Sequence, residues 1–406
     1  MNPIDLCLDT ARMRDMLAAW LPGAPDIAEV RILQARRSAS KRRHPHPLTA
    51  VYELALRDGR TQRWYAKTWR DGASLAALPV SGPATVAVPP LDMLLWPWPA
   101  DPGLPQLREL LDARRALTWR GDAPAAVDVL RWEPEQRATL RYAQAGATLY
   151  AKTFADDRGA HIHERFRHVW TLAQQEPAAP AVAEPLRWHA ATRSVWQARA
   201  PGVPLPDLLA GSRTGDLPGR LARALAALHG CRIAGVETRH DLAHWTAEAW
   251  RRARKLGRAL PMLADRAARV ADVLERSGAT LPDHEPGLIH GDFHAGQVGV
   301  DVAAGGRIVF HDFDEFALGD PMEDLAAFVT RLPARPDFGA ALTAAYAEAA
   351  PHRFGRERLR WHRALQALLQ ASRAFVFQLP GWSAEAERRL ARAETLAAPD
   401  SAETLA

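Results

Sequence analysis

The fold of this chain is decided by the stretch Leu288-Ile-His-Gly-Asp-Phe-His-Ala-Gly-Gln297, together with Ile308-Val-Phe-His-Asp-Phe-Asp314 and Gly319-Asp-Pro-Met-Glu-Asp324. In the first two stretches an aspartate follows a short apolar run, which is where a strand ends and a loop can present a carboxylate. The segment between them, Asp301-Val-Ala-Ala-Gly-Gly306, predicts a hairpin turn because glycine adopts positive backbone angles freely. Such a hairpin would bring Asp292, Gln297 and Asp312 together at one end of a small sheet. Two carboxylates and an amide in one place suit an oxygen-ligated divalent cation, of which Mg²⁺ is the best match.

The same stretches resemble the aminoglycoside phosphotransferase and choline kinase superfamily. The resemblance is carried by His290-Gly-Asp292 with a side-chain amide five residues on, by the hydrophobic-Asp-Phe-acidic run, and by Gly319-Asp-Pro. Members of that superfamily have a protein-kinase-like fold and phosphorylate small-molecule hydroxyls, so the resemblance implies ATP and Mg²⁺ as cofactors. It implies Asp292 as the catalytic base and Gln297 and Asp312 as magnesium ligands. The superfamily usually has Asn at the position of Gln297, whereas its maltokinase-like branch resembles this chain in carrying Gln.

Other polar residues near the motif have supporting roles. Asp314 either assists the metal, in place of a glutamate often found in relatives, or lies behind the ligands as a solvated acid; we include it among the candidate metal ligands. Asp320 and Asp324 resemble the acids that brace the catalytic loop and the following helix. We expect His229, at the end of a leucine-rich helix, and His290 to be scaffold residues of the same loop.

Two alternatives to an active kinase remain at this stage. Six His and Asp residues in these stretches are potential transition-metal ligands, so a zinc hydrolase is conceivable, but His-Gly-Asp-Phe-His does not form a helical pair of ligands. The stronger alternative is a catalytically weak nucleotide-binding or regulatory pseudokinase. It is favoured by Gln297 and by the absence of a Gly-rich phosphate loop after residues 127–132. Arg137, which follows there instead, either covers the phosphates or forms a surface ion pair.

Upstream of the motif, a group of three strand-like runs occurs twice. The first group covers residues 30–33, 50–56 and 64–69, and the second covers 127–132, 138–142 and 148–154. The third run of each group contains Tyr-Ala-Lys-Thr, which places two of the chain's four lysines, Lys67 and Lys152, at matching positions. We interpret the match as a duplicated β unit, with a coincidence of strand-like sequence as the alternative.

Elements typical of kinases follow the second group in order. In kinases a strand lysine holds the α- and β-phosphates and is positioned by a helix glutamate. Lys152 and Glu164, twelve residues later, fit that pairing. The strand-like stretch 194–205 resembles the hinge of the family, where backbone groups around Gln197 and Arg199 would meet the adenine edge.

Composition and charge are those of a globular chain with two or three packed units. Of the 406 residues, 48% are hydrophobic and 24% are charged, and no run of about 18 apolar residues predicts a membrane span. The N-terminal residues do not have the pattern of a signal peptide, and Cys7 and Cys231 are too few for a disulfide framework, so we expect a cytoplasmic protein. The net charge of +5 comes almost entirely from arginine. Its densest cluster contains no aromatic residues, so nucleic-acid binding is not expected.

These features predict an α+β, protein-kinase-like fold of two lobes. The small mixed or antiparallel β N-lobe covers residues 121–202, the mainly helical C-lobe with the catalytic hairpin covers 203–406, and an accessory β-containing unit that begins with a helix over 6–21 covers 1–120. The predicted function is ATP-dependent phosphorylation of a hydroxyl on a sugar, an aminoglycoside or an amino alcohol. The acceptor would lie between the catalytic hairpin and the C-terminal helices, in a polar pocket lined by Trp361, His362, Gln370 and Trp382.

Overall fold

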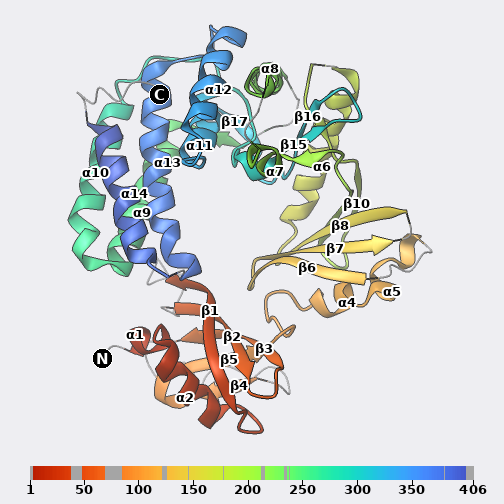
Figure 1. Ribbon diagram of the computed structural model, residues 1–406, viewed down its shortest axis with the longest axis vertical. Helices are drawn as coiled ribbons and strands as arrows, with labels where there is room; N and C mark the ends of the chain where they lie inside the picture. Colours follow the sequence, from red (N-terminus) through yellow and green to blue (C-terminus); the bar gives the residue numbers. More distant parts are fainter. Residues whose placement is uncertain are drawn as a thin grey trace.

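The computed structural model describes residues 3–37, 48–68, 85–120, 126–144, 146–176, 178–211, 215–232, 236, 238–378 and 380–398. It has three parts: an N-terminal unit, a second β-sheet, and a large helical lobe that carries the two chain segments of the catalytic motif (Figure 1). The predicted α+β class is therefore confirmed. Among the described residues, no helix is both long and apolar enough to cross a bilayer.

The N-terminal unit is an antiparallel five-stranded sheet with two helices packed on one face. The helices are α1 (Pro3–Cys7) and α2 (Thr10–Trp20), and the strands are β1 (Ile27–Arg37), β2 (Leu48–Leu56), β3 (Thr61–Thr68), β4 (Val86–Val88) and β5 (Met93–Pro97), in the order β1-β2-β3-β5-β4. The predicted single helix over 6–21 is wrong, because the Asp9 carboxylate accepts hydrogen bonds from the amides of Ala11 and Arg12 and starts a new helix there.

The second sheet is also antiparallel and five-stranded. Its strands are β6 (Ala126–Glu133), β7 (Arg137–Gln144), β8 (Ala147–Phe154), β10 (Pro185–His189) and β11 (Ser194–Ala198), in the order β10-β11-β8-β7-β6. The long helix α6 (Arg158–Gln175) follows β8, while α4 (Leu107–Leu111), α5 (Ala113–Ala116) and the short helix η2 (Thr118–Arg120) precede β6. Both sheets thus have a three-stranded meander whose third strand pairs with the last strand of the unit. The shared order agrees with a duplication, which stays a prediction.

The helical lobe contains most of the chain's helices and the short strands of the catalytic motif. Its helices are α7 (Leu205–Leu209), α8 (Leu217–Gly230), α9 (Leu242–Ala259), α10 (Ala264–Gly278), α11 (Met322–Thr330), α12 (Pro336–Ala349), α13 (Arg356–Phe377) and α14 (Trp382–Ala397), with the short helices η3 (Pro261–Leu263) and η4 (Ala295–Gln297). A further short helix, η1 (Pro89–Leu91), lies in the N-terminal unit. The short strands are β9 (Ala181–Val182), β12 (Val203–Pro204), β13 (Arg239–His240), β14 (Gly287–Ile289), β15 (Val298–Asp301), β16 (Arg307–Phe310) and β17 (Ala317–Gly319).

The predicted catalytic hairpin is formed by β15 and β16. These strands pair antiparallel from Val298 opposite Phe310 to Asp301 opposite Arg307, and Gly305 and Gly306 in the turn have φ values of 68° and 81°. Only glycine adopts such angles without strain, which is why the turn forms here. The hairpin places the loop before β15 beside the loop after β16.

The N-terminal unit contacts both other parts of the molecule. One face of its sheet belongs to an apolar cluster that includes Phe375, in the last turn of α13. The opposite face packs Tyr65 and Trp96 against Trp132 of the second sheet, and the Tyr65 and Trp132 rings have centroids 6.3 Å apart. The unit therefore bridges the second sheet and the helical lobe on the side away from the catalytic hairpin's turn (Figure 1).

Candidate active site

A buried carboxylate holds the catalytic loop that connects β14 to β15. Asp324, in the first turn of α11, accepts hydrogen bonds from the amides of His290 (2.7 Å) and Gly291 (2.9 Å). Its other neighbour is His229, whose Nε2 lies 3.2 Å from Asp324 Oδ2 and whose Nδ1 lies 2.7 Å from the Tyr346 hydroxyl. Burial raises the pKa of Asp324, but hydrogen bonds from His229 and the backbone outweigh burial, so the net pKa is lowered and the group is a carboxylate. The predicted bracing roles of Asp324 and His229 are confirmed.

Two further contacts join the catalytic loop to the loop that follows β16. His290 Nε2 donates to the carbonyl of His311 at 2.6 Å. Gly291 has a φ of +81°, and a Cβ atom there would lie 2.2 Å from the carbonyl oxygen of Glu315, so glycine alone fits this close approach. The relative position of the two loops is thus fixed by the backbone itself.

Asp292 lies next in the catalytic loop and is partly exposed. Its carboxylate accepts a hydrogen bond from Arg331 Nη1, at the end of α11, at 2.5 Å. Burial raises the pKa of Asp292, but the ion pair with Arg331 and the nearby charge of Arg373 lower it more, so that the net pKa is below the ordinary value. An ionised carboxylate that is open to solvent and precisely anchored can accept a proton from a bound hydroxyl.

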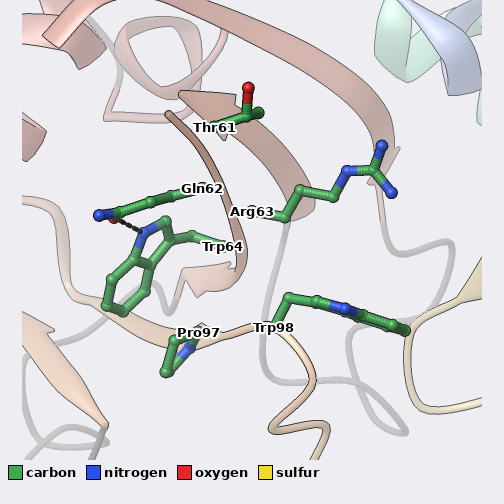
Figure 2. Close-up of a pocket in the computed structure, with 6 residues that line it drawn as sticks. All are labelled: Thr61, Gln62, Arg63, Trp64, Pro97 and Trp98. Atoms are coloured by element: carbon green, nitrogen blue, oxygen red, sulfur yellow. Dashed lines mark hydrogen bonds between the residues drawn. The ribbon is translucent and has the colours of Figure 1, made fainter. Parts of the chain in front are cut away.

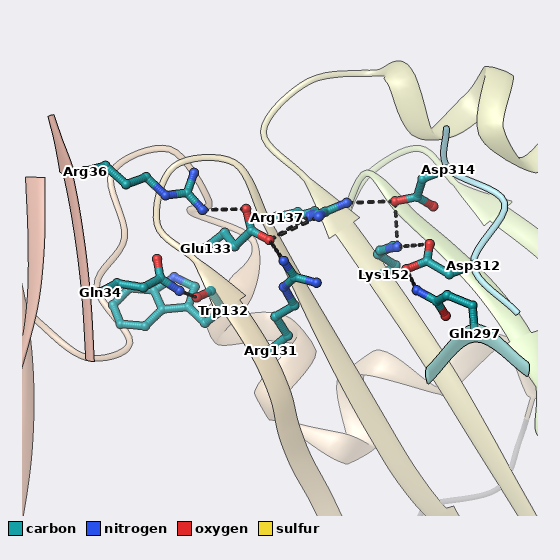
Figure 3. A network of polar contacts seen from close by, with 10 residues as sticks. All are labelled: Gln34, Arg36, Arg131, Trp132, Glu133, Arg137, Lys152, Gln297, Asp312 and Asp314. Carbon is teal, nitrogen blue, oxygen red and sulfur yellow. Dashed lines mark hydrogen bonds and ion pairs between the residues drawn. The ribbon is translucent and has the colours of Figure 1, made fainter. Parts of the chain in front are cut away.

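The predicted metal ligands lie together on the other side of this loop. Gln297 Nε2 is 3.3 Å from Asp312 Oδ2, and Lys152 Nζ lies 2.6 Å from Asp312 and 2.5 Å from Asp314 (Figure 3). Arg137 Nη1 donates to Asp314 at 3.0 Å. Burial raises the pKa of both aspartates; beside Lys152 the net pKa of Asp312 is lowered, whereas that of Asp314, next to the Asp312 charge, is raised.

This donor set fits a hard cation such as Mg²⁺. Two carboxylates already surround a positive charge, the Lys152 ammonium, and the Gln297 amide lies within reach of them. Asp312 has a φ of +61°, a strained conformation that turns its carboxylate toward Lys152 and Gln297. Among the described residues, no group of three or more His, Cys, Asp or Glu is arranged to hold a metal ion.

The predicted pair of Lys152 with Glu164 is wrong. Glu164 is exposed on α6, and the two residues share no hydrogen bond or ion pair. The packed face of α6 carries Ile162, Phe166 and Val169 instead, and this packing leaves Glu164 on the exposed side of the helix. Lys152 is positioned by Asp312 and Asp314.

The predicted hinge residues lie where β11 ends, next to β8. Gln197 is opposite Tyr150 in the sheet, and the Arg199 side chain is exposed. The amide of Ala198 donates to Glu184 and that of Arg199 donates to Thr148, each at 3.0 Å. These two donors are therefore already used, and an adenine ring would have to contact other backbone groups of the segment.

A polar network that the sequence did not predict connects this site to the N-terminal unit. Glu133, at the end of β6, accepts from Arg36 of β1 at 2.6 Å, from Arg131 at 2.6 Å and from Arg137 at 3.1 Å (Figure 3). Lys67 of β3 pairs with Glu135 in the same β6–β7 turn. Arg137 thus lies between Glu133 and Asp314 and forms ion pairs with both, at the site rather than on the open surface; a role in covering the phosphates stays a prediction.

We expect Glu133→Gln to lower the free energy of unfolding by about 3 kcal/mol at neutral pH. Burial raises the pKa of Glu133, but Arg137 and Arg36 outweigh it and bring the pKa from 4.5 to about 2. This stabilisation is complete above pH 4.5 and is lost as pH falls toward about 2. In urea titrations at different pH values, the free energy of unfolding of the variant should therefore fall less steeply with decreasing pH than that of the unmodified protein. Asp128→Asn, which removes an exposed carboxylate of the same strand, should cost under about 1 kcal/mol. If both variants lose the same free energy of unfolding, the ion pairs of Glu133 do not stabilise the fold more than an exposed carboxylate does.

Two cavities complete the description. One, of about 560 Å³, lies at the edge of the N-terminal sheet where β3 and β5 pair, and Figure 2 shows Trp64 and Trp98 among its walls. It contains none of the predicted site residues. The other, of about 570 Å³, is bounded by the catalytic loop after Asp292, the end of α11, and helices α13 and α14.

The second cavity lies where the acceptor was expected, but its lining differs from the prediction. Gln370 lines it, whereas Trp361, His362 and Trp382 do not. Trp361 is buried between helices and donates to the Leu274 carbonyl, and His362 pairs with Asp320. Trp382 packs against Phe375. Helical spacing alone does not show which faces of α13 and α14 meet the neighbouring helices, so the sequence could not separate Gln370 from the two tryptophans.

Comparisons with known proteins agree with this geometry. The model of the phosphotransferase enzyme family matches residues 146–362, more than half of the chain. No functionally curated protein matches the sequence at a significant level.

Solved structures of aminoglycoside phosphotransferases have the same fold. The apo form of a thermostable mutant of aminoglycoside phosphotransferase APH(4)-Ia has 18% identity and a TM-score of 0.53, over 71% of this chain and 99% of that chain. The GDP complex of wild-type aminoglycoside 2'-phosphotransferase-IIIa has 16% identity and a TM-score of 0.51, over 72% and 99%. At these identities the similarity shows the fold alone, which confirms the predicted protein-kinase-like architecture. On the match of the family model, the chain belongs to the phosphotransferase enzyme family.

Proposed function

We propose that this phosphotransferase transfers the γ-phosphoryl group of ATP to a hydroxyl of a small molecule, with Mg²⁺ as cofactor. The observation that carries the proposal is the position of Lys152, Asp312 and Asp292 around one edge of the catalytic hairpin. Lys152 contacts Asp312, and Asp292 is fixed by the same pair of loops. Phosphoryl transfer needs these three parts: a cation for the phosphates, metal ligands, and a group that accepts the hydroxyl proton.

Each residue has a distinct role in the proposal. Lys152 would bind phosphate oxygens, and Gln297, Asp312 and Asp314 would hold the metal, which when bound neutralises charge on the phosphates. Asp292 would take the proton of the acceptor hydroxyl as the oxygen attacks phosphorus. Arg331 keeps the Asp292 carboxylate in place and ionised. The fixed geometry of the two loops then supplies the alignment on which most of the rate acceleration depends.

The proposal is tested by removing the two lysines of the repeated Tyr-Ala-Lys-Thr sequence one at a time. Lys152→Met should abolish the rise in melting temperature that MgATP causes and lower ADP release by about 10²-fold or more. Lys67→Met, the matched control, removes an ion pair with Glu135 and should retain the MgATP effect. ADP release by Asp312→Asn should no longer increase when Mg²⁺ is added. If Lys152→Met binds MgATP as well as the unmodified protein does, the proposed nucleotide site is wrong.

A further inference from the structure

The cavity beside Asp292 is lined by an excess of positive charge. Five arginines line it, against one carboxylate, Glu385; the arginines are Arg331, Arg373, Arg388, Arg389 and Arg392. They come from the end of α11, from α13 and from α14, so three separate helices direct guanidinium groups to one space. The loop residues that follow Asp292, from His294 to Gly296, form the opposite wall.

The single carboxylate does not balance this charge. Glu385 is already paired with Arg388 and with Arg389, whose Nε lies 2.5 Å from it. Arg373 and Arg392 form no hydrogen bond or ion pair with any residue that the structure describes. Burial and the neighbouring charge of Arg331 lower the pKa of Arg373 to about 10, although the Asp292 charge partly opposes this, so Arg373 stays protonated at neutral pH.

Three buried donors on the same cavity wall also lack partners. Within the described part of the chain, Thr330 Oγ1, Arg331 Nε and Gln370 Nε2 are inaccessible to solvent and unbonded. Buried polar atoms are nearly always paired in folded proteins. The residues that line the cavity therefore retain hydrogen-bonding capacity that no protein group among the described residues uses.

We propose that the acceptor carries an anionic group, a carboxylate or a phosphate, in addition to the hydroxyl that is phosphorylated. This inference rests on the proposed function, and it specifies the class of acceptor for the same site. Guanidinium groups bind planar carboxylates and phosphates through paired hydrogen bonds, which suits Arg373 and Arg392 as the first contacts. A cationic acceptor, such as an aminoglycoside or an amino alcohol, would instead meet like charges from Arg373 and Arg392.

The same arrangement connects the anion to the catalytic carboxylate. Arg331 lines the cavity and also pairs with Asp292. An anion bound in the cavity would therefore lie next to the residue that holds the catalytic carboxylate, which places the acceptor close to Asp292.

The test compares sets of acceptors that share one carbon skeleton and differ in a single charged substituent. Glucose, glucosamine, glucuronate and glucose 6-phosphate are neutral, cationic, carboxylate and phosphate members of one set; glycerol, glycerate and glycerol 3-phosphate form a shorter one. Each is titrated into the MgATP-loaded protein by calorimetry, and acceptor-dependent ADP release is recorded. We expect an anionic member of a set to bind at least about ten-fold tighter than its neutral and cationic counterparts. Comparison of the carboxylate and phosphate members distinguishes the two anions.

Substitutions of the two arginines without a described partner then test whether the anion binds in this cavity. Arg373→Gln and Arg392→Gln should each weaken binding of the preferred anion at least about five-fold and raise its KM while MgATP affinity is unchanged. Arg254→Gln is the matched control, because Arg254 is an exposed arginine of α9 outside the cavity, and it should change neither value. The inference is overturned if no anionic member binds better than its counterparts, or if both cavity variants behave like the control. If the unmodified protein does not bind MgATP, the proposed function is contradicted instead.

Discussion

Replacing Asp292 with asparagine is expected to lower kcat by about 10²–10⁴-fold and to leave MgATP binding unchanged. Asparagine has nearly the same size and can still accept a hydrogen bond from Arg331, so the loop should keep its conformation. It cannot accept a proton at neutral pH, however, and the acceptor hydroxyl would have to lose its proton to water. The measurement is steady-state ADP release with a saturating acceptor, alongside calorimetric titration of MgATP.

The control for this prediction is Asp301→Asn, which neutralises another aspartate of the hairpin. Asp301 accepts a hydrogen bond from the Ala304 amide in the turn and lies away from the metal ligands in the pairing register. Its substitution should change kcat less than about three-fold. Normal turnover by Asp292→Asn would mean that another group, or the phosphate itself, accepts the proton of the substrate hydroxyl. A pseudokinase would give the opposite pattern: MgATP binding without acceptor-dependent turnover in the unmodified protein.

Removing the Asp324 carboxylate is expected to destabilise the fold more than any exposed substitution in the helical lobe. Asp324→Ala leaves the amides of His290 and Gly291 and the ring of His229 without their partner in a fully buried site. Breaking a buried, hydrogen-bonded charge typically costs about 3–5 kcal/mol. Urea unfolding followed by tryptophan fluorescence measures the loss, and ADP release should fall with it because the catalytic loop is no longer held.

Two comparisons make the Asp324 prediction specific. Asp324→Asn retains one acceptor oxygen and should cost less than the alanine substitution. Asp337→Ala, which removes an exposed ion pair with Arg335 at the start of α12, should leave the urea midpoint nearly unchanged, because solvent screens exposed charges. If Asp324→Ala and Asp337→Ala give similar midpoints, the bracing role is incorrect.

The N-terminal unit bears on both experiments because it connects the nucleotide side of the site to the helices around the cavity. It contacts the β6–β7 turn through Arg36 and Lys67, and it contacts α13 through the cluster around Phe375. Movements of the second sheet relative to the helical lobe must therefore be accommodated by these contacts. The family model begins at residue 146, so the accessory role of the preceding region stays a prediction.

The sequence by itself determined the elements whose signals are local. Alternating apolar runs and the Gly305-Gly306 turn predict the β15–β16 hairpin, because strand pairing across a short turn depends on neighbouring residues. The hairpin pattern likewise predicted Asp292, Gln297 and Asp312 at one end of a small sheet, and Gln297 does contact Asp312. The roles of these residues, and of Asp292 as the base, stay predictions.

Only the tertiary structure decided which distant residues meet. Helical periodicity could not show that Glu164 faces solvent, because the rotation of α6 is set by the apolar residues that pack beneath it. Arg331, Arg373 and Arg392 belong to three helices, and nothing in their spacing predicts a shared cavity; the one local signal was the run of arginines at 388, 389 and 392 on α14. Long-range packing brings these charges together, since side chains far apart in sequence become neighbours only when the helices are docked. The local sequence thus predicts the hairpin, whereas the positive charge of the cavity beside Asp292 depends on how the helices pack.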